Sequence, residues 1–156
     1  MNKASLAALA LLVALAALVT GCGGGDETTD SATVALTKAE FIKQGDAICK
    51  QGNEQSEEEA EEFAEENGFT LEKASDEELE EAVAEVLVPS LSQQAEEIGA
   101  LGAPEGDEEK VEEIVVSLEG AAEEIEEDPG LVFEGEVLEE PEKLAQGYGF
   151  KVCGEE

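Results

Sequence analysis

Apolar residues recur at intervals of three and four positions along two long stretches of this 156-residue chain. In the first stretch they are Leu79, Ala82, Val83, Val86, Leu87, Leu91, Ala95, Ile98 and Leu101. In the second they are Val111, Ile114, Val115, Leu118, Ala122 and Ile125. This spacing places the side chains on one face of an α-helix, which has about 3.6 residues per turn. No stretch alternates convincingly with a period of two, so the pattern predicts an all-α fold.

An earlier helix is predicted to begin at Thr37, because Thr37 and Glu40 have the spacing of a capping box. It is predicted to stop at residues 67–68, an Asn-Gly pair typical of a helix C-terminus. Its apolar face carries Phe41, Ile48, Cys49, Ala60 and Phe63. Gly45 and Gly52 lie along the same stripe, which indicates close approach by another helix.

The second helix is predicted to begin with another capping box, formed by Ser75 and Glu78. Pro89 should bend this helix or divide it in two, because proline lacks a backbone N–H group. The third helix is predicted to end before residues 128–130, and Pro141 to be the first residue of a short final helix. We therefore expect a small antiparallel bundle of three long helices and one short helix.

The N-terminal residues have the layout of a secretory signal. Lys3 is followed by an apolar run from Ala4 to Val19, which is shorter than the roughly 20 residues of a membrane span. The run leads into Leu18-Val19-Thr20-Gly21-Cys22, which resembles the bacterial lipobox. That resemblance implies a diacylglyceryl group on the Cys22 sulfur and cleavage before Cys22. Ordinary cleavage at a small-residue site and an uncleaved anchor are the alternatives.

These features predict three parts of the chain. Residues 1–21 are expected to be a lipoprotein signal peptide, and residues 22–36 a flexible tether. The tether is rich in Gly, Thr and acidic residues and has almost nothing to bury. Residues 37–156 are expected to form the helical bundle domain. The predicted location is the extracytoplasmic face of the cell membrane, with the lipid on Cys22 as the anchor.

Two cysteines, Cys49 and Cys153, remain once Cys22 is assigned to the lipid. Outside the cytoplasm thiols are oxidised, and two thiols allow one internal pairing. We expect a disulfide between Cys49 and Cys153 that closes the bundle. The alternative is a reactive or redox thiol, although the chain has no Cys-x-x-Cys motif and no histidine to activate a thiolate.

Acidic residues greatly outnumber basic ones, with 41 Asp and Glu against eight Lys. Without residues 1–21, which include Lys3, seven lysines remain and the formal net charge is −34. Nucleic acid is therefore excluded as a partner, because phosphate binding needs clustered Lys or Arg. Histidine, arginine and tryptophan are absent, which removes most common catalytic side chains. The sequence predicts no cofactor, no metal ligand and no catalytic residue.

Glutamates gather in three clusters, at residues 57–66, 77–81 and 123–127. A calcium site needs several oxygens that converge on one ion, and no Asp-x-Asp-x-Asp-Gly loop is present. Paired carboxylates can act as acid and base in glycoside hydrolysis, but among 41 acids such pairs are not diagnostic. We interpret the clusters as a solvated anionic face, with weak cation binding as the alternative. Crowding of like charges is expected to raise the pKa of Glu carboxyls.

Four short motifs carry a resemblance to a known group of proteins. They are Leu36–Ile42 (LTKAEFI), Ala47–Cys49 (AIC), Leu101–Pro104 (LGAP) and Tyr148–Gly154 (YGFKVCG). The chain resembles small secreted or lipid-anchored actinobacterial helical proteins with paired cysteines. The resemblance implies a helical extracytoplasmic module and assigns no activity.

The favoured function is a lipid-anchored helical module that acts by binding or interaction, without catalysis. Its expected partners are the membrane, through the lipid on Cys22, and a cell-envelope protein or a small ligand. One alternative is an acidic, calcium-responsive or cell-wall structural protein, and another is an enzyme that uses its acidic residues. Tyr148 and Phe150, which lie near Cys153, either pack in the core or line a small ligand pocket.

Overall fold

The structure is a computed structural model that describes residues 35–154. Its elements are α1 (Lys38–Asn67), η1 (Leu71–Lys73), α2 (Asp76–Ala82), η2 (Val83–Leu87), α3 (Val88–Ala100), α4 (Glu108–Glu127), α5 (Leu131–Glu134) and α6 (Glu139–Tyr148). The described residues contain no strand, which confirms the all-α prediction. The predicted signal peptide, Cys22 and most of the predicted tether lie outside the described residues.

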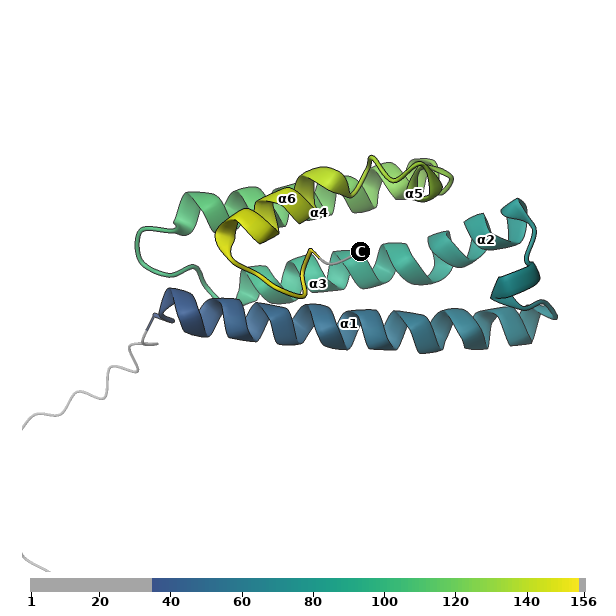
Figure 1. Cartoon of the computed structure of the whole chain (residues 1–156), viewed down its shortest axis with the longest axis horizontal. Coiled ribbons are helices and arrows are strands. Elements are labelled where there is room, and N and C mark those ends of the chain that lie inside the picture. The colour runs from purple at the N-terminus through teal and green to yellow at the C-terminus, as the bar shows by residue number, and fades with distance from the viewer. Residues whose placement is uncertain (1–34, 155–156) are drawn as a thin grey trace, which may run out of the picture. The chain divides into compact units, whose positions relative to one another are not determined.

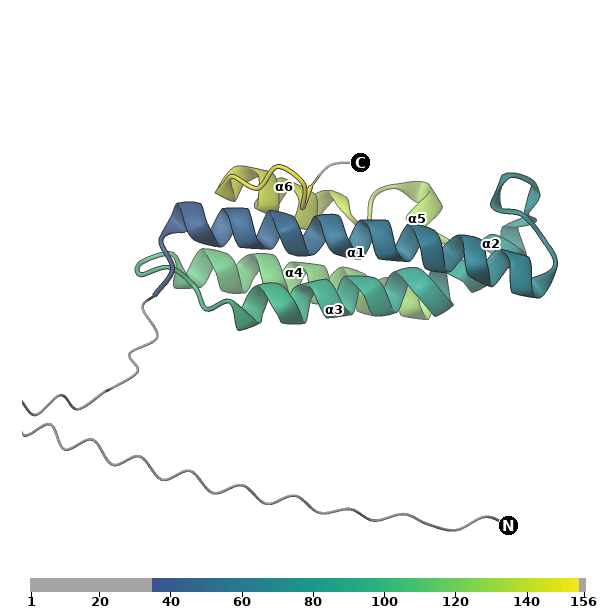
Figure 2. The ribbon, with the colours of Figure 1, turned by 90° about the horizontal axis from the view of Figure 1, so that it is seen from below.

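The three long helical segments are α1, the segment α2–η2–α3, and α4, and each runs opposite to the one before it (Figures 1 and 2). The segment α2–η2–α3 is continuous and forms the second long helix of the bundle. Helix α3 packs against α1 on one side and α4 on the other, and α6 packs on α4. The predicted bundle of three long helices and one short helix is confirmed for this part of the chain.

Both predicted capping boxes are present. The Thr37 hydroxyl accepts from the Glu40 N–H at 3.3 Å, and the Glu40 carboxylate accepts from the Thr37 N–H at 3.0 Å. Ser75 and Glu78 make the same reciprocal bonds. These bonds from Thr37 and Ser75 hold the pKa values of Glu40 and Glu78 below the usual range, because they favour the ionised carboxyl. The expectation that crowding raises Glu pKa values is therefore wrong at both caps.

Pro89 does not divide the second helix but widens it just upstream. Residues Val83–Leu87 form a π-helical turn, and the Val88 N–H donates to the Val83 carbonyl, five residues back. Proline has no N–H, and its ring collides with the carbonyl four residues earlier in a regular α-helix. A single π turn absorbs both problems, and α3 continues without a break to Ala100.

The hydrophobic core lies where α1, α3, α4 and α6 meet. Its buried residues are Phe41, Cys49, Ile98, Val111, Ile114, Ala145, Tyr148 and Phe150. The Phe41 ring packs against both Tyr148 and Phe150, with ring centroids 5.9 Å apart in each case. Tyr148 and Phe150 are thus core residues, which answers the choice between packing and a ligand pocket in favour of packing.

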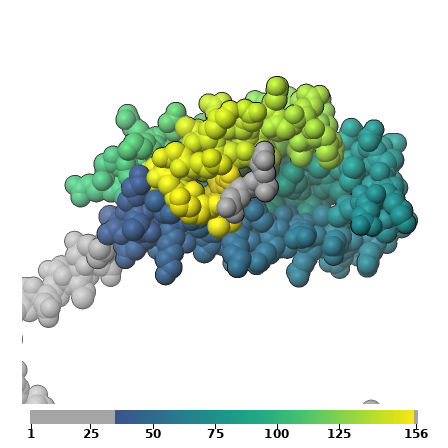
Figure 3. Space-filling model, in the orientation of Figure 1, coloured from purple at the N-terminus to yellow at the C-terminus, as the bar shows by residue number. Residues whose placement is uncertain are grey.

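The segment after α6 turns back across α1 (Figure 3). Cys153 forms the expected disulfide with Cys49, with Cα atoms 5.2 Å apart. Asp46 holds the same segment, because its carboxylate accepts from the backbone N–H groups of Lys151 and Val152, both at 2.8 Å. The C-terminal segment therefore closes the bundle between α6 and α1.

The two glycines of α1 make room for different neighbours. A Cβ atom on Gly52 would lie 2.6 Å from the side chain of Gln94 in α3, as expected for a close helix contact. A Cβ atom on Gly45 would lie 2.4 Å from the ring of Phe150. The expectation of a second helix at Gly45 is wrong, because the C-terminal segment occupies that place.

The final helix begins earlier than predicted. Helix α6 starts at Glu139, and Pro141 is its third residue, buried against the bundle. A helix tolerates proline there because the first-turn N–H groups have no partner within the helix. The short helix α5 was not predicted by the apolar periodicity. No helix among residues 35–154 combines the length and apolar character needed to cross a membrane.

Candidate functional site

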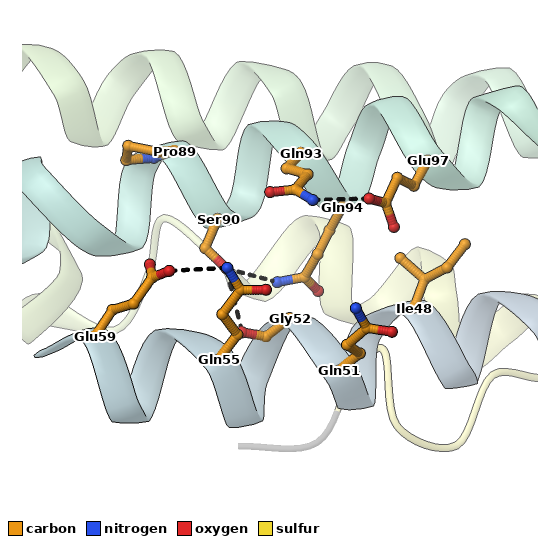
Figure 4. Close-up of a pocket in the computed structure, with 10 residues that line it drawn as sticks. All are labelled: Ile48, Gln51, Gly52, Gln55, Glu59, Pro89, Ser90, Gln93, Gln94 and Glu97. Carbon is orange, nitrogen blue, oxygen red and sulfur yellow. Dashed lines mark hydrogen bonds between the residues drawn. The ribbon is translucent and has the colours of Figure 1, made fainter. Parts of the chain in front are cut away.

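A polar cleft of about 120 Å³ lies between α1 and α3 (Figure 4). Four of the chain's six glutamines line it, together with Gly52 and Ser90. The Gln94 side chain is only 5% exposed, and it reaches the backbone of α1 because Gly52 has no side chain there. The Ser90 hydroxyl lies 3.4 Å from the Gly52 carbonyl, to which it donates. The cleft floor is thus built by direct contact between the two helices.

Hydrogen bonds fix how the glutamine amides are oriented. Gln55 donates to Glu59 and Gln93 donates to Glu97, each at 2.8 Å. An ionised carboxylate only accepts hydrogen bonds, so each amide must turn its nitrogen toward the glutamate. Gln94 donates to Ser90 at 3.2 Å, because the hydroxyl proton of Ser90 is directed at Gly52. The amide carbonyl oxygens therefore remain as acceptors.

The two glutamates lie at opposite ends of the cleft, and the glutamines lie between them (Figure 4). Helices α1 and α3 run in opposite directions, so each contributes a Gln-x-x-x-Glu pair from a different end. The residues that line the cleft include no lysine. Its chemistry is therefore that of a row of oxygen acceptors with a negative charge at each end.

No known protein family, curated protein or solved structure matches the chain. Evidence on the function therefore comes from the site itself.

A second hollow, of about 180 Å³ and mainly apolar, is separated from the polar cleft by Gln94. The two disulfide-bonded cysteines, Cys49 and Cys153, line this second hollow. The half-cystines are bonded to each other, so the reactive-thiol alternative is not supported by this geometry.

The three acidic clusters lie on the outer faces of α1, α2 and α4, and most of their carboxylates are exposed. Within residues 35–154, no group of three or more Asp, Glu, His or Cys side chains is placed to hold a metal ion. Glu59 is the one member of the clusters that lines the polar cleft. The clusters therefore give the domain its charge, and a single residue from them contributes to the cleft.

A separate polar contact secures the end of the bundle where α1 and α4 begin. Asp107 accepts from the Tyr148 hydroxyl at 3.1 Å and from Lys110 at 2.8 Å, and Lys38 lies 3.6 Å away. Lys110 in particular holds the pKa of Asp107 below its usual range. Burial, together with the bond to Asp107, raises the pKa of Tyr148 to about 12.

The buried Tyr148 should make the fold sensitive to alkali. Its raised pKa means that the unfolded chain loses the phenol proton first, so stability falls as pH rises from about 10 to about 12. We expect Tyr148 to account for about 2–3 kcal/mol of that loss. Tyr148→Phe should remove this part of the loss, measured by urea unfolding at pH 9 and pH 12. Because Tyr148 is the only tyrosine and tryptophan is absent, tyrosinate absorbance reports its pKa directly. A native pKa near 10 would contradict the expectation.

Sequence reasoning missed Gln94, Ser90, Asp46 and Asp107. Asp46 precedes Cys49 by three positions, so the two residues share a face of the helix. This spacing is the signal in the sequence that places Asp46 near the disulfide. Gln94 sits between apolar Leu91 and Ala95 in a predicted apolar stripe, where a polar residue is unusual. No comparable signal marked Asp107, because its partner Tyr148 is 41 positions away.

Proposed function

We propose that the protein is a lipid-anchored binding module on the extracytoplasmic face of the cell membrane, and that it takes a small polar solute in the cleft between α1 and α3. The observation that carries the binding site is the Gln94 amide. Its side chain is 5% exposed, and its nitrogen donates to Ser90 in the wall of the cleft. Every fully buried side-chain nitrogen or oxygen among residues 35–154 has a hydrogen-bond partner. A polar side chain that its neighbours hold in place gives the cleft fixed hydrogen-bonding groups, which favours binding of a small polar solute.

The anchor is supported by the sequence that ends at Cys22. The apolar run, the lipobox-like Leu18-Val19-Thr20-Gly21 and the following Gly-rich tether form one continuous export and lipidation signal. A tether of 15 residue steps from Cys22 to Thr37 has a root-mean-square reach of roughly 20 Å. The bundle would then stay near the membrane while its acidic surface is repelled by anionic lipids. The resemblance to actinobacterial lipid-anchored proteins agrees with this placement.

Binding is a better account of the cleft than catalysis. Ser90 carries the one hydroxyl group among the residues that line the cleft, and this hydroxyl donates a hydrogen bond to the Gly52 carbonyl. A serine nucleophile needs a general base at that position. The acidic structural role remains as a second candidate, favoured by the net charge. A shift of the melting temperature with sub-millimolar calcium in a background of about 0.5 M sodium chloride is its test.

Lipidation is tested by Cys22→Ala. We expect loss of radiolabelled-palmitate incorporation and either release from the membrane fraction or retention of an uncut precursor. Ser31→Ala, within the tether, is the matched control and should keep the lipid. A wild-type mature protein that begins at a residue other than Cys22 would contradict the anchor.

A further inference from the structure

We propose that the short helix α5 is a docking surface for a cationic segment of a partner protein, one that places an apolar anchor residue between lysines or arginines. Helix α5 shares no residue with the lining of the α1–α3 cleft. The surface is therefore a second interaction site, and it does not depend on what the cleft binds.

The exposed ring of Phe133 is the feature that carries the proposal. The other four phenylalanines all pack against an aromatic ring: Phe41 lies against Phe150, and Phe63 lies against Phe69. Phe133 is 54% exposed, and no aromatic ring among residues 35–154 packs against it. The fold therefore leaves this one large aromatic side chain without a role in the core.

Backbone hydrogen bonds hold α5 in place without help from the Phe133 ring. The Asp128 carboxylate accepts from the Gly130 N–H at 3.2 Å, and the Asp128 carbonyl accepts from the Leu131 N–H at 3.1 Å. The Phe133 N–H donates to the Gly130 carbonyl at 3.1 Å. These bonds fix the short helix to the end of α4, so its backbone presents the ring to solvent on an ordered turn.

Apolar character continues along the chain on both sides of Phe133. Leu131 and Val132 precede it, and Val137 and Leu138 follow it, and all four are only partly buried. An exposed apolar segment of this kind is typical of an interaction surface, and a single exposed side chain is not. An aromatic ring at its centre is the side chain that most often dominates binding energy in protein interfaces.

Carboxylates lie around this apolar segment. Residues 119–142 contain eleven acidic residues and no lysine, and Glu134 and Glu136 are exposed on either side of Gly135. Helix α2 lies at the same end of the bundle (Figures 1 and 2), and a Cβ atom on Gly130 would be 3.5 Å from a carboxylate oxygen of Glu80. An occupant of the α5 surface thus meets an apolar centre with negative charges at its edge.

Charge complementarity selects the occupant. An anionic lipid surface would be repelled by these carboxylates. A second copy of the chain would be repelled as well, because each copy has a formal net charge of −33. A segment with lysines or arginines beside an apolar anchor satisfies both parts of the surface: the anchor packs on Phe133, and the cations lie near the carboxylates.

The proposal is tested with a six-residue peptide that has two central leucines and two lysines on each side. The full chain is held in phosphatidylcholine nanodiscs in about 150 mM sodium chloride, with empty nanodiscs as the blank. Fluorescence anisotropy of the labelled peptide should show saturable binding, and Phe133→Ala should weaken the affinity by about tenfold. The matched control is Val116→Ala, because Val116 is the other large exposed apolar residue, at 58%, and its loss should change the affinity less than about twofold.

The contribution of charge is tested with two triple variants. Glu80→Gln, Glu134→Gln and Glu136→Gln together should weaken binding by about fivefold and reduce its dependence on salt. The control replaces Glu105, Glu109 and Glu112 by glutamine, which removes the same charge near the start of α4, at the other end of the bundle (Figure 1). This control should change the affinity less than about twofold. Circular dichroism checks that each variant keeps its helical fold.

Four results would overturn the proposal. The first is no detectable binding of the leucine peptide. The second is equal binding of a peptide with serines in place of the two leucines, or equal weakening by both triple variants, since either means general attraction of cations to an acidic chain. The third is dimerisation of the wild type, and not of Phe133→Ala, in sedimentation, which would identify a second copy as the occupant. The fourth is a Phe133-dependent attachment to phosphatidylglycerol nanodiscs, which would identify a lipid surface.

Discussion

Replacement of both Cys49 and Cys153 by alanine is expected to lower the free energy of unfolding by about 4–5 kcal/mol. The disulfide joins positions 104 residues apart, so it restricts nearly the whole bundle when the chain unfolds. In the chain-entropy description, a longer closed loop gives a larger effect. Small domains have a total stability of about 5–15 kcal/mol, and the bond is therefore a large part of it. Urea unfolding monitored by circular dichroism measures the difference.

The native fold of the double variant should be retained, because Asp46 still holds the C-terminal segment by backbone hydrogen bonds. Wild-type protein treated with a reductant provides the control and should lose the same stability. A loss of less than about 1 kcal/mol would show that the constraint on the unfolded chain contributes little. Two free thiols in protein isolated from the cell envelope would show that the bond does not form in the cell.

Phe41→Ala should also be strongly destabilising, by about 3–5 kcal/mol. The Phe41 side chain is fully buried and packs against the rings of Tyr148 and Phe150. Truncation would leave a cavity at the point where α1, α6 and the C-terminal segment meet. The rigid ring stack gives the neighbours little freedom to fill that cavity.

Phe133→Ala is the matched control, since Phe133 lies on the short helix α5 and is 54% exposed. Its removal should change stability by no more than about 0.5 kcal/mol. Both variants are compared with the wild type by urea unfolding. Similar losses for the two substitutions would mean that the ring cluster is not the main packing centre.

The helix boundaries that depend on local chemistry were predicted correctly. Thr37 with Glu40 and Ser75 with Glu78 form their capping boxes within four residues. Gly68 ends α1 in a left-handed conformation, with a φ of 83°, that glycine adopts at little cost. Each of these features needs only its sequence neighbours, so the sequence pattern was sufficient.

Features that depend on distant contacts were missed or misassigned. Gly45 was expected to face a helix, but its neighbour is Phe150, more than one hundred residues away. Pro141 was predicted to be the first residue of α6, but the helix begins at Glu139, because residues 139 and 140 already have the helical conformation. The candidate cleft could not be predicted either, since Gln94 and Gly52 come together only when α1 and α3 pack.

The π turn at Val83–Leu87 sets the rotational phase between two halves of one helix. Each residue of a regular α-helix advances the side-chain direction by about 100°, and a π turn contains one residue more than an α turn. The apolar face of α2 is thereby rotated relative to the face of α3 so that both Ala82 and Ile98 are buried. Deleting one residue from this segment would restore a uniform helix and turn Leu79 and Ala82 away from the core. The number of residues before Pro89 is thus under as strong a constraint as their apolar character.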